Sequence, residues 1–336
     1  MHSKTVHLAV DMMSGDSGLR ITIPAVFQAL QDFPRITLHL TGDSSAIEKA
    51  VTAWPDVFHA RVNIIHAPDC LAGDVNPATV LKKDHDSSAS AALKLVSDGV
   101  ASAVISAGNA GALMILARKI IGVLQDNNRP ALCSQFPTET GFSLLLDLGA
   151  NVDCSAEQLQ YFAVLGSALH SALYAGAQAK VGLLSNGVEA TKGNAVVRRA
   201  AQYFSDAPDI DYRGYIEANQ LHRGEVDVVV VDGFVGNIAL KAIEGTAEIA
   251  SNELKRLVDA SSLNGDLAQE ILQKFALAMD PELHNGAFLL GLSGVVVKAH
   301  GDSSVEGFVS SIAQALLCEE LSMTAKMKHC LDSNMI

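Results

Sequence analysis

The residues best suited to chemistry in this sequence are lysine, aspartate and asparagine side chains in glycine-rich turns that follow strand-like runs. Two turns have this form most clearly: residues 106–111, with the sequence SAGNAG, and residues 232–237, with the sequence DGFVGN. Glycine lets the backbone approach a ligand closely, and a helix that begins at such a turn presents N–H groups to an anion. We expect a helix after each turn, with Asn237 as the N-cap of the second. The pattern predicts a site for an anion, and a phosphate group fits it best.

A third turn carries a lysine suited to stabilising negative charge. Lys192 is followed by Gly193 and Asn194 and then by a helical pattern. From such a turn its ammonium can reach a phosphate or a developing oxyanion. The alternative is a solvated side chain on a surface loop. Asp232 ends a continuous run of valines, and a carboxylate held there can orient or deprotonate a reacting group.

Two weaker segments add polar groups in the same arrangement. Asp11, Gly15 and Asp16 follow the first strand-like run, whereas Lys298 ends the last one and His300 follows it. Structural roles in turns and helix caps remain the alternative for both segments.

Motifs of several other chemistries are missing from the sequence. It holds no dinucleotide fingerprint, Walker loop, nucleophile elbow or zinc-protease motif. Its five cysteines are odd in number and no two have a C-x-x-C spacing, which argues against a disulfide framework or a zinc cluster. We therefore expect no cofactor and no metal.

The elements that position these turns are strand-like runs alternating with helical patterns. The expected strands are residues 6–10, 36–41, 62–66, 101–106, 143–147, 181–184, 226–231 and 294–298. This alternation predicts one α/β domain over residues 1–336, with a mostly parallel sheet covered by helices on both faces. Ligands of such sheets bind beyond the carboxyl ends of the strands, so we expect the turns to meet there. Residues 243–278 differ, because two helical patterns around residues 261–265 predict an αα-hairpin inserted into the domain.

Composition limits the possible partners and location. The chain has 336 residues, of which 49% are hydrophobic, and a formal net charge of −13. This acidity argues against general nucleic-acid binding. No signal-peptide pattern is visible, and the longest uncharged stretch, residues 99–117, has the pattern of a strand, a turn and a helix. We expect a cytoplasmic protein.

In their order along the chain, these segments resemble the phosphate acyltransferases of bacterial phospholipid synthesis, the PlsX family. The resemblance covers nearly the whole chain and rests on residues 11–16, 106–113, 147–154, 192–194 and 232–237, on Lys241 and Glu244, and on residues 298–301. It departs from the usual family pattern at Ser14, Ala110, Val188 and Val235.

The resemblance implies transfer of a long-chain fatty-acyl group from an acyl-carrier-protein thioester to inorganic phosphate, which gives acyl phosphate for glycerolipid synthesis. It implies a three-layer α/β/α fold related to phosphate acetyltransferases and the isocitrate-dehydrogenase group, without cofactor or metal. It also implies a homodimer that contacts the inner face of the plasma membrane peripherally, and a downstream glycerol-phosphate acyltransferase as a further partner.

Roles for individual residues follow from the same resemblance. Lys192 is expected to stabilise charge on the thioester oxygen or sulfur, and Asp232 to orient Lys192 or a phosphate proton. The turns at 106–111 and 232–237 would together donate N–H groups to one phosphate dianion. The expected phosphate- and substrate-binding residues are Asp11, Gly15, Asp16, Ser106, Gly108, Asn109, Gly111, Asn194, Gly233, Asn237, Lys241 and His300.

Other functions remain open at this level. One is a phosphate acyltransferase that uses short-chain acyl-coenzyme A, and another is a non-catalytic ligand-binding scaffold of the same fold. A nicotinamide-dependent dehydrogenase is disfavoured because no dinucleotide fingerprint is present. Acyl carrier protein is itself acidic, so its docking needs a local group of cations. The candidate docking residues are Lys82, Lys83, Arg118, Lys119, Arg198 and Arg199.

Overall fold

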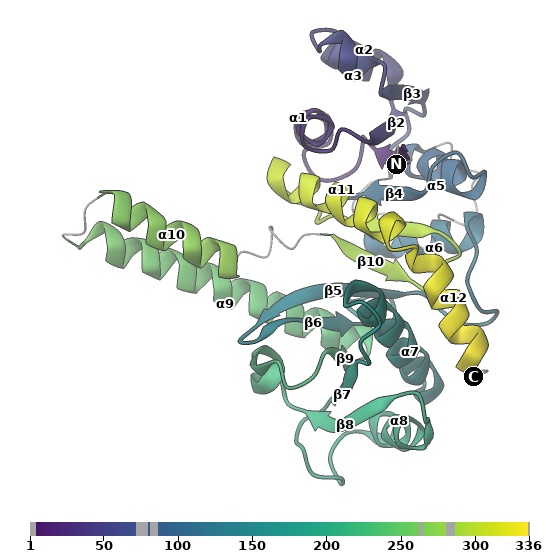
Figure 1. Ribbon diagram of the computed structural model, residues 1–336, viewed down its shortest axis with the longest axis vertical. Coiled ribbons are helices and arrows are strands. Elements are labelled where there is room, and N and C mark those ends of the chain that lie inside the picture. Colours follow the sequence, from purple (N-terminus) through teal and green to yellow (C-terminus); the bar gives the residue numbers. More distant parts are fainter. Residues whose placement is uncertain (1–4, 72–79, 81–86, 262–264, 280–285, 335–336) are drawn as a thin grey trace.

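The described strands form one continuous sheet through the body of the molecule (Figure 1). The computed structural model describes residues 5–71, 80, 87–261, 265–279 and 286–334. The strand order is β3-β2-β1-β4-β11-β10-β5-β6-β9-β7-β8. The strands are β1 (Val6–Asp11), β2 (Ile36–Gly42), β3 (Val62–His66), β4 (Ala103–Ser106), β5 (Ala131–Thr138), β6 (Gly141–Leu146), β7 (Lys180–Leu184), β8 (Asp211–Ile216), β9 (Val228–Val230), β10 (Ala287–Leu290) and β11 (Val295–Lys298).

The sheet contains two parallel groups that run in opposite directions. Strands β1, β2, β3, β4 and β11 are mutually parallel, as are β6, β7, β8 and β9. Between the groups, β10 is antiparallel to β11 and to β5, and β5 is antiparallel to β6. These three reversals put the carboxyl ends of the two groups at opposite edges. The predicted mostly parallel α/β fold is confirmed, but the expectation that all the turns meet at one edge is wrong.

Helices cover both faces of the sheet and make two hydrophobic cores. One core packs β1, β2, β6 and β9 against α1, α7, α8, α11 and α12, and the other packs the opposite face of the sheet against α5, α6 and α9. Alternation along each strand divides its side chains between the cores, as Leu8 and Ala9 show in β1. The helices are α1 (Leu19–Asp32), α2 (Ser44–Val51), α3 (Asp56–His59), α5 (Ser88–Ser97), α6 (Ala110–Ile120), α7 (Ala156–Leu173), α8 (Ala195–Asp206), η1 (Ala218–Arg223), α9 (Gly233–Asp259), α10 (Gly265–Met279), α11 (Val305–Glu320) and α12 (Met323–Asn334).

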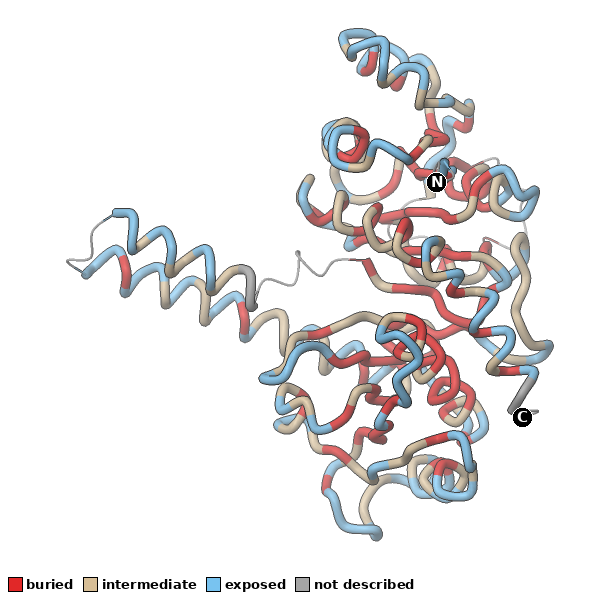
Figure 2. Tube along the Cα trace, in the orientation of Figure 1, coloured by how far each residue is buried: buried red, intermediate tan, exposed pale blue. Residues whose placement is uncertain are grey.

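Helices α9 and α10 form the predicted αα-hairpin, which projects from the body of the molecule (Figure 1). Most of its length is exposed or only partly buried (Figure 2). The hairpin extends further into the fold than predicted, because α9 begins at Gly233, directly after β9. Among the helices of the described ranges, none combines the length and apolar composition needed to cross a bilayer.

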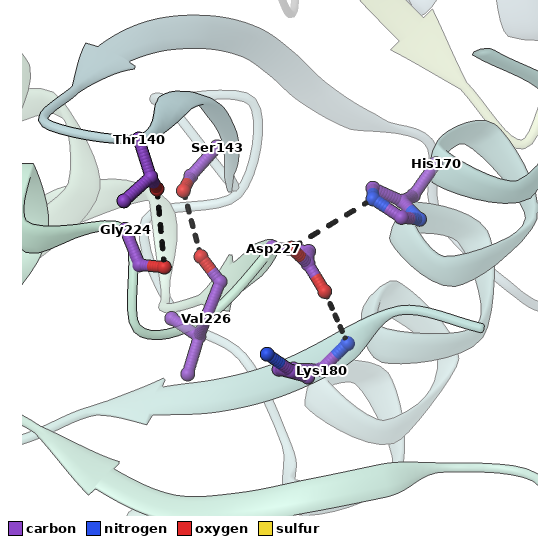
Figure 3. Close-up of polar contacts among 7 residues, drawn as sticks. All are labelled: Thr140, Ser143, His170, Lys180, Gly224, Val226 and Asp227. Atoms are coloured by element: carbon purple, nitrogen blue, oxygen red, sulfur yellow. Dashed lines mark hydrogen bonds and ion pairs between the residues drawn. The ribbon is translucent and has the colours of Figure 1, made fainter. Parts of the chain in front are cut away.

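Side-chain contacts tie the start of β9 to the neighbouring strands (Figure 3). Ser143 Oγ donates a hydrogen bond of 2.7 Å to the Val226 carbonyl. The backbone N–H of Lys180 donates to Asp227 Oδ2 at 2.8 Å, and His170 Nε2 lies 3.8 Å from Asp227 Oδ1. These contacts align the amino ends of β6, β7 and β9, and so determine where the turn after β9 begins.

Candidate functional site

A buried polar unit lies at the carboxyl ends of β1 and β4. Ser106 Oγ donates a 2.7 Å hydrogen bond to Asp11 Oδ2, and both residues are buried. Burial raises the pKa of Asp11, and the Ser106 hydroxyl opposes that rise. The Gly108 N–H donates to Ser106 Oγ at 3.1 Å, and a Cβ at position 108 would lie 3.2 Å from the same oxygen. Gly108 therefore permits the close approach that ties the turn to this unit.

The turn after β1 joins the turns after β4 and β11. Ser14 Oγ donates to the Asp11 carbonyl at 2.8 Å and accepts from the Ala107 N–H at 2.9 Å. The serine that departs from the family pattern thus links two turns through its hydroxyl. The Asp16 N–H donates to the Gly301 carbonyl at 2.8 Å. Gly15 allows this packing, because its φ is +80° and a Cβ there would lie 3.1 Å from the Gly301 oxygen.

Two lysines, a histidine and two carboxylates complete this edge; we call Asp16, Lys241, Glu244, Lys298 and His300 the Lys298 cluster. Lys298 ends β11, and its ammonium donates to the carbonyls of Ala107, at 3.4 Å, and Ala299. Burial, with a further contribution from the Lys241 charge, lowers the pKa of Lys298 to about 8, while Asp16 acts in the opposite direction. Lys241 Nζ donates to Glu244 Oε2 at 2.7 Å and to His300 Nε2 at 3.0 Å.

The Lys298 cluster has the chemistry of a phosphate site. Two ammonium groups stand near the start of α6, where Asn109 Oδ1 accepts from the Ala112 N–H at 3.0 Å and Gly111 lies in the first turn. A helix N-terminus adds N–H donors and a favourable dipole for an anion. The Asp16 carboxylate can accept the hydrogen of a protonated phosphate oxygen. Nine of the twelve predicted binding residues lie at this edge, namely Asp11, Gly15, Asp16, Ser106, Gly108, Asn109, Gly111, Lys241 and His300.

The other edge holds the start of α9. Asp232 Oδ1 accepts from the Val235 N–H at 2.9 Å, so Asp232 caps this helix. The prediction of Asn237 as the cap is wrong, because α9 already begins at Gly233 and Asn237 lies in its second turn, beside Gly149. The Gly233 N–H donates to the Asn151 carbonyl at 2.8 Å, which fixes the helix start against the loop after β6.

Lys192 and Asn194 lie at this same edge, in the turn after β7. Lys192 Nζ is 3.9 Å from Glu189 Oε2, and the lysine side chain is 41% exposed. Asn194 caps α8 by accepting from the Val197 N–H at 2.9 Å. Within the ranges that the structure describes, no hydrogen bond or ion pair joins Lys192 to Asp232, so the structure does not show the expected pairing.

Helix α9 connects the two edges. Lys241 is eight positions after Gly233 in α9, which corresponds to a rise of about 12 Å along the helix. The turns at 106–111 and 232–237 therefore do not surround one phosphate, contrary to the expectation from the sequence. The described parts of the chain also contain no group of three or more histidine, cysteine, aspartate or glutamate residues placed to hold a metal ion.

Sequence comparison relates this chain to enzymes that act on phosphate and acyl groups. The family model described as "Fatty acid synthesis protein" matches residues 6–325. The chain is 44% identical over 329 residues to the phosphate acyltransferase of Pseudomonas syringae pv. syringae (strain B728a), covering 97% of this chain and 96% of the relative. It is 42% identical over 324 residues to the phosphate acyltransferase of Stutzerimonas stutzeri (strain A1501), covering 96% and 91%.

Solved structures with a similar fold include enzymes of two kinds. A phosphotransacetylase from Streptococcus pyogenes gives a TM-score of 0.62 at 16% identity, covering 93% of this chain and 94% of that one. A 4-hydroxythreonine-4-phosphate dehydrogenase from Klebsiella pneumoniae gives 0.54 at 13% identity, covering 94% and 97%. At these identities the likeness concerns the fold alone.

Proposed function

Because this chain belongs to the fatty acid synthesis protein family, we propose that it transfers a long-chain fatty-acyl group from the thioester of acyl carrier protein to inorganic phosphate. Its near-full-length identity to phosphate acyltransferases makes it an acyltransferase. The structural observation that carries the proposal is the Lys298 cluster, in which Lys298 and Lys241 lie together near the start of α6. The paired cations suit a phosphate dianion as the acyl acceptor.

The proposed reaction needs no protein nucleophile. A phosphate oxygen attacks the thioester carbonyl carbon, the carbon–sulfur bond breaks, and the acyl group becomes bonded to phosphate. The electron pair of the broken bond leaves with sulfur, and the proton of HPO₄²⁻ goes to that sulfur, which gives acyl phosphate and the free thiol. Lys298 and Lys241 hold the dianion beside the thioester, and the nearest ammonium stabilises charge on the carbonyl oxygen during attack.

The carboxylates of this edge have supporting roles in the proposal. Asp16 accepts the phosphate hydrogen and so selects the monoprotonated form. Glu244 holds the Lys241 ammonium toward His300 through its 2.7 Å contact. Asp11, Ser106 and Ser14 fix the turns on which the phosphate rests. Apart from that of Asp16, these roles depend on contacts that are already present without substrate.

For Lys192 and Asp232 we propose a narrower role than the sequence suggested. Their turns lie at the edge about 12 Å along α9 from Lys241, so they are placed to contact the acyl donor where it enters, not the phosphate. Asn194 and Gly233 shape the helix starts beside them, and Asn237 lies one turn further along α9. This division assigns one edge to each substrate.

The function is tested by incubating the purified chain with palmitoyl-carrier protein and phosphate, with phosphate omitted as the control. We expect phosphate-dependent release of carrier thiol and palmitoyl phosphate detected by mass spectrometry. Parallel reactions with acetyl-coenzyme A test the short-chain alternative, which the phosphotransacetylase fold brings into consideration. If acetyl-coenzyme A is turned over and palmitoyl-carrier protein is not, the acyl donor is a short-chain acyl-coenzyme A and the proposed carrier-protein donor is wrong. Absence of turnover with every thioester would leave the scaffold alternative.

We further propose that the protein is a homodimer. We also propose that it contacts the membrane peripherally, and that the α9–α10 hairpin makes this contact. Ile249, Leu257 and Leu267 are 72%, 53% and 43% exposed on it, which suits insertion at a lipid surface. The double variant Ile249→Glu/Leu257→Glu should lose co-sedimentation with anionic phospholipid vesicles, whereas Val57→Glu, an exposed valine on α3, should not. Equal vesicle binding by the wild type and both variants would contradict the membrane contact. A monomeric mass from light scattering would contradict the homodimer.

A further inference from the structure

A cavity of about 400 Å³ lies where the last turns of α6 face the loop after β6. Its walls include Met114, Ile115 and Arg118 of α6, Arg129 before β5, and Val152 and Asp153 after β6. The volume is in the usual range for small-molecule sites. The cavity is at the edge that holds the start of α9, because Asn151, which also lines it, accepts from the Gly233 N–H.

Two arginines give this cavity an anion-binding character. Among the described residues, neither the Arg118 nor the Arg129 guanidinium makes a hydrogen bond or an ion pair, although the chain carries a net charge of −13. Asp153 is the one carboxylate among the residues that line the cavity. With the two arginines, the lining therefore has a net charge of about +1. Guanidinium groups bind phosphate through paired hydrogen bonds, and apolar walls beside them suit an uncharged chain attached to that phosphate.

The face of α6 leads from this cavity to the Lys298 cluster. Ala110, Met114 and Arg118 are spaced by four residues and share one face, and about 12 Å of helix separates the first from the last. The chain between the phosphodiester and the sulfur of phosphopantetheine has about as many atoms as four residues, and extends about 15 Å. A phosphodiester at Arg118 would therefore place its sulfur near the start of α6.

We propose that this cavity binds the phosphodiester of a phosphopantetheine thioester, with the pantetheine chain lying along α6 toward the Lys298 cluster. The inference rests on the proposed function, since that function supplies the thioester. It assigns Arg118 and Arg129 to the acyl donor, whereas Lys298 and Lys241 bind the acceptor. Of the candidate docking cations, Arg118 is thus a binding residue for the arm, and Lys82 and Lys83 lie outside the described residues.

The test compares the double variant Arg118→Ala/Arg129→Ala with Lys49→Ala, which removes an exposed cation of α2 that does not line the cavity. The double variant should raise the KM for palmitoyl-carrier protein and for palmitoyl-coenzyme A at least about tenfold, and leave the KM for phosphate within about twofold. Calorimetry with free 4′-phosphopantetheine should show loss of binding. Asp153→Asn should tighten that binding a few-fold, because it removes the opposing charge.

Several outcomes would overturn the inference. A rise only in the KM for phosphate would make the cavity a phosphate site. The KM could instead rise for palmitoyl-carrier protein but not for palmitoyl-coenzyme A, while free 4′-phosphopantetheine still binds the double variant. That result would place the arginines against the surface of the carrier protein. Unchanged KM values in the double variant, or an equal effect of Lys49→Ala, would remove the cavity from the reaction. If the wild-type chain transfers no acyl group, the proposed function fails, and the calorimetry still decides whether the cavity binds phosphopantetheine.

Discussion

Replacing Lys298 with alanine is expected to lower kcat/KM for phosphate by at least about 100-fold, equivalent to about 2.7 kcal/mol of transition-state stabilisation. Lys298 is the ammonium held deepest among the turns, through the carbonyls of Ala107 and Ala299. Without Lys298, Lys241 is the one ammonium left in the Lys298 cluster to attract the phosphate dianion, while the Asp16 and Glu244 carboxylates repel it. Initial rates of acyl-phosphate formation at varied phosphate, with palmitoyl-carrier protein saturating, provide the measurement. A loss below about threefold would remove Lys298 from the phosphate site.

The same lysine predicts a pH dependence. With its pKa lowered to about 8, Lys298 is cationic below that pH and neutral above it, so kcat/KM for phosphate should fall as the pH rises through about 8. Lys241→Met removes a repulsive charge, so the fall should move to higher pH. Lys298→Arg keeps the charge and should abolish the fall while retaining part of the rate. A profile unchanged in both variants would assign the titration to another group.

Lys192→Ala is the matched comparison for Lys298→Ala. Lys192 is 41% exposed and faces Glu189, so it is well solvated and should stabilise a developing charge less than the partly buried Lys298 ammonium does. We expect its replacement to raise the KM for the acyl donor more than that for phosphate. A loss in kcat/KM for phosphate as large as that of Lys298→Ala would move the reacting phosphate to the turns after β7 and β9.

The fold was predictable from the sequence where a strand is a continuous apolar run, as in β9, or is mostly apolar with β-branched residues, as in β1 and β2. The strands that were missed have weaker patterns. Strand β5 contains Pro137 and polar residues, β8 contains Arg213 and Gly214 at the sheet edge, and β10 has only four residues. Since β5 and β10 make the antiparallel pairings, missing them also concealed the reversal that separates the two sets of turns.

The candidate site was predictable in its residue types but not in its grouping. Glycine-rich turns identified Asp11, Asn109 and His300, because their local chemistry is visible in a few neighbouring residues. The place of Lys298 depends on the parallel pairing of β11 with β4, which aligns Lys298 with Ser106. That pairing joins segments about 190 residues apart, and local patterns carry no information on such a register. The sequence therefore identifies Lys298 as a polar group of its turn but does not place it among the expected binding residues.

The second large effect is expected at the start of α9, where Gly236→Ala should destabilise the protein by about 3 kcal/mol and lower its Tm. A Cβ at this position would lie 1.9 Å from the Asp147 carbonyl oxygen and 2.9 Å from Val231 Cγ1. The loop cannot retreat easily, because the buried Asp147 carboxylate accepts from Leu132 N–H at 3.0 Å and from Asn151 N–H at 2.7 Å. The helix start must move instead.

Gly245→Ala is the control, because it makes the same substitution later in α9, where the new Cβ meets no atom within 4 Å beyond its chain neighbours and the nearby backbone of its own helix. It should raise stability by up to about 1 kcal/mol, through the higher helix propensity of alanine. Movement of the helix start would also displace Lys241 from His300, so Gly236→Ala should raise the KM for phosphate in the folded fraction. Gly245 follows Lys241 and should leave that KM unchanged. Equal stability of the two variants would contradict the close packing, and an unchanged KM in Gly236→Ala would show that Lys241 is positioned independently of the helix start.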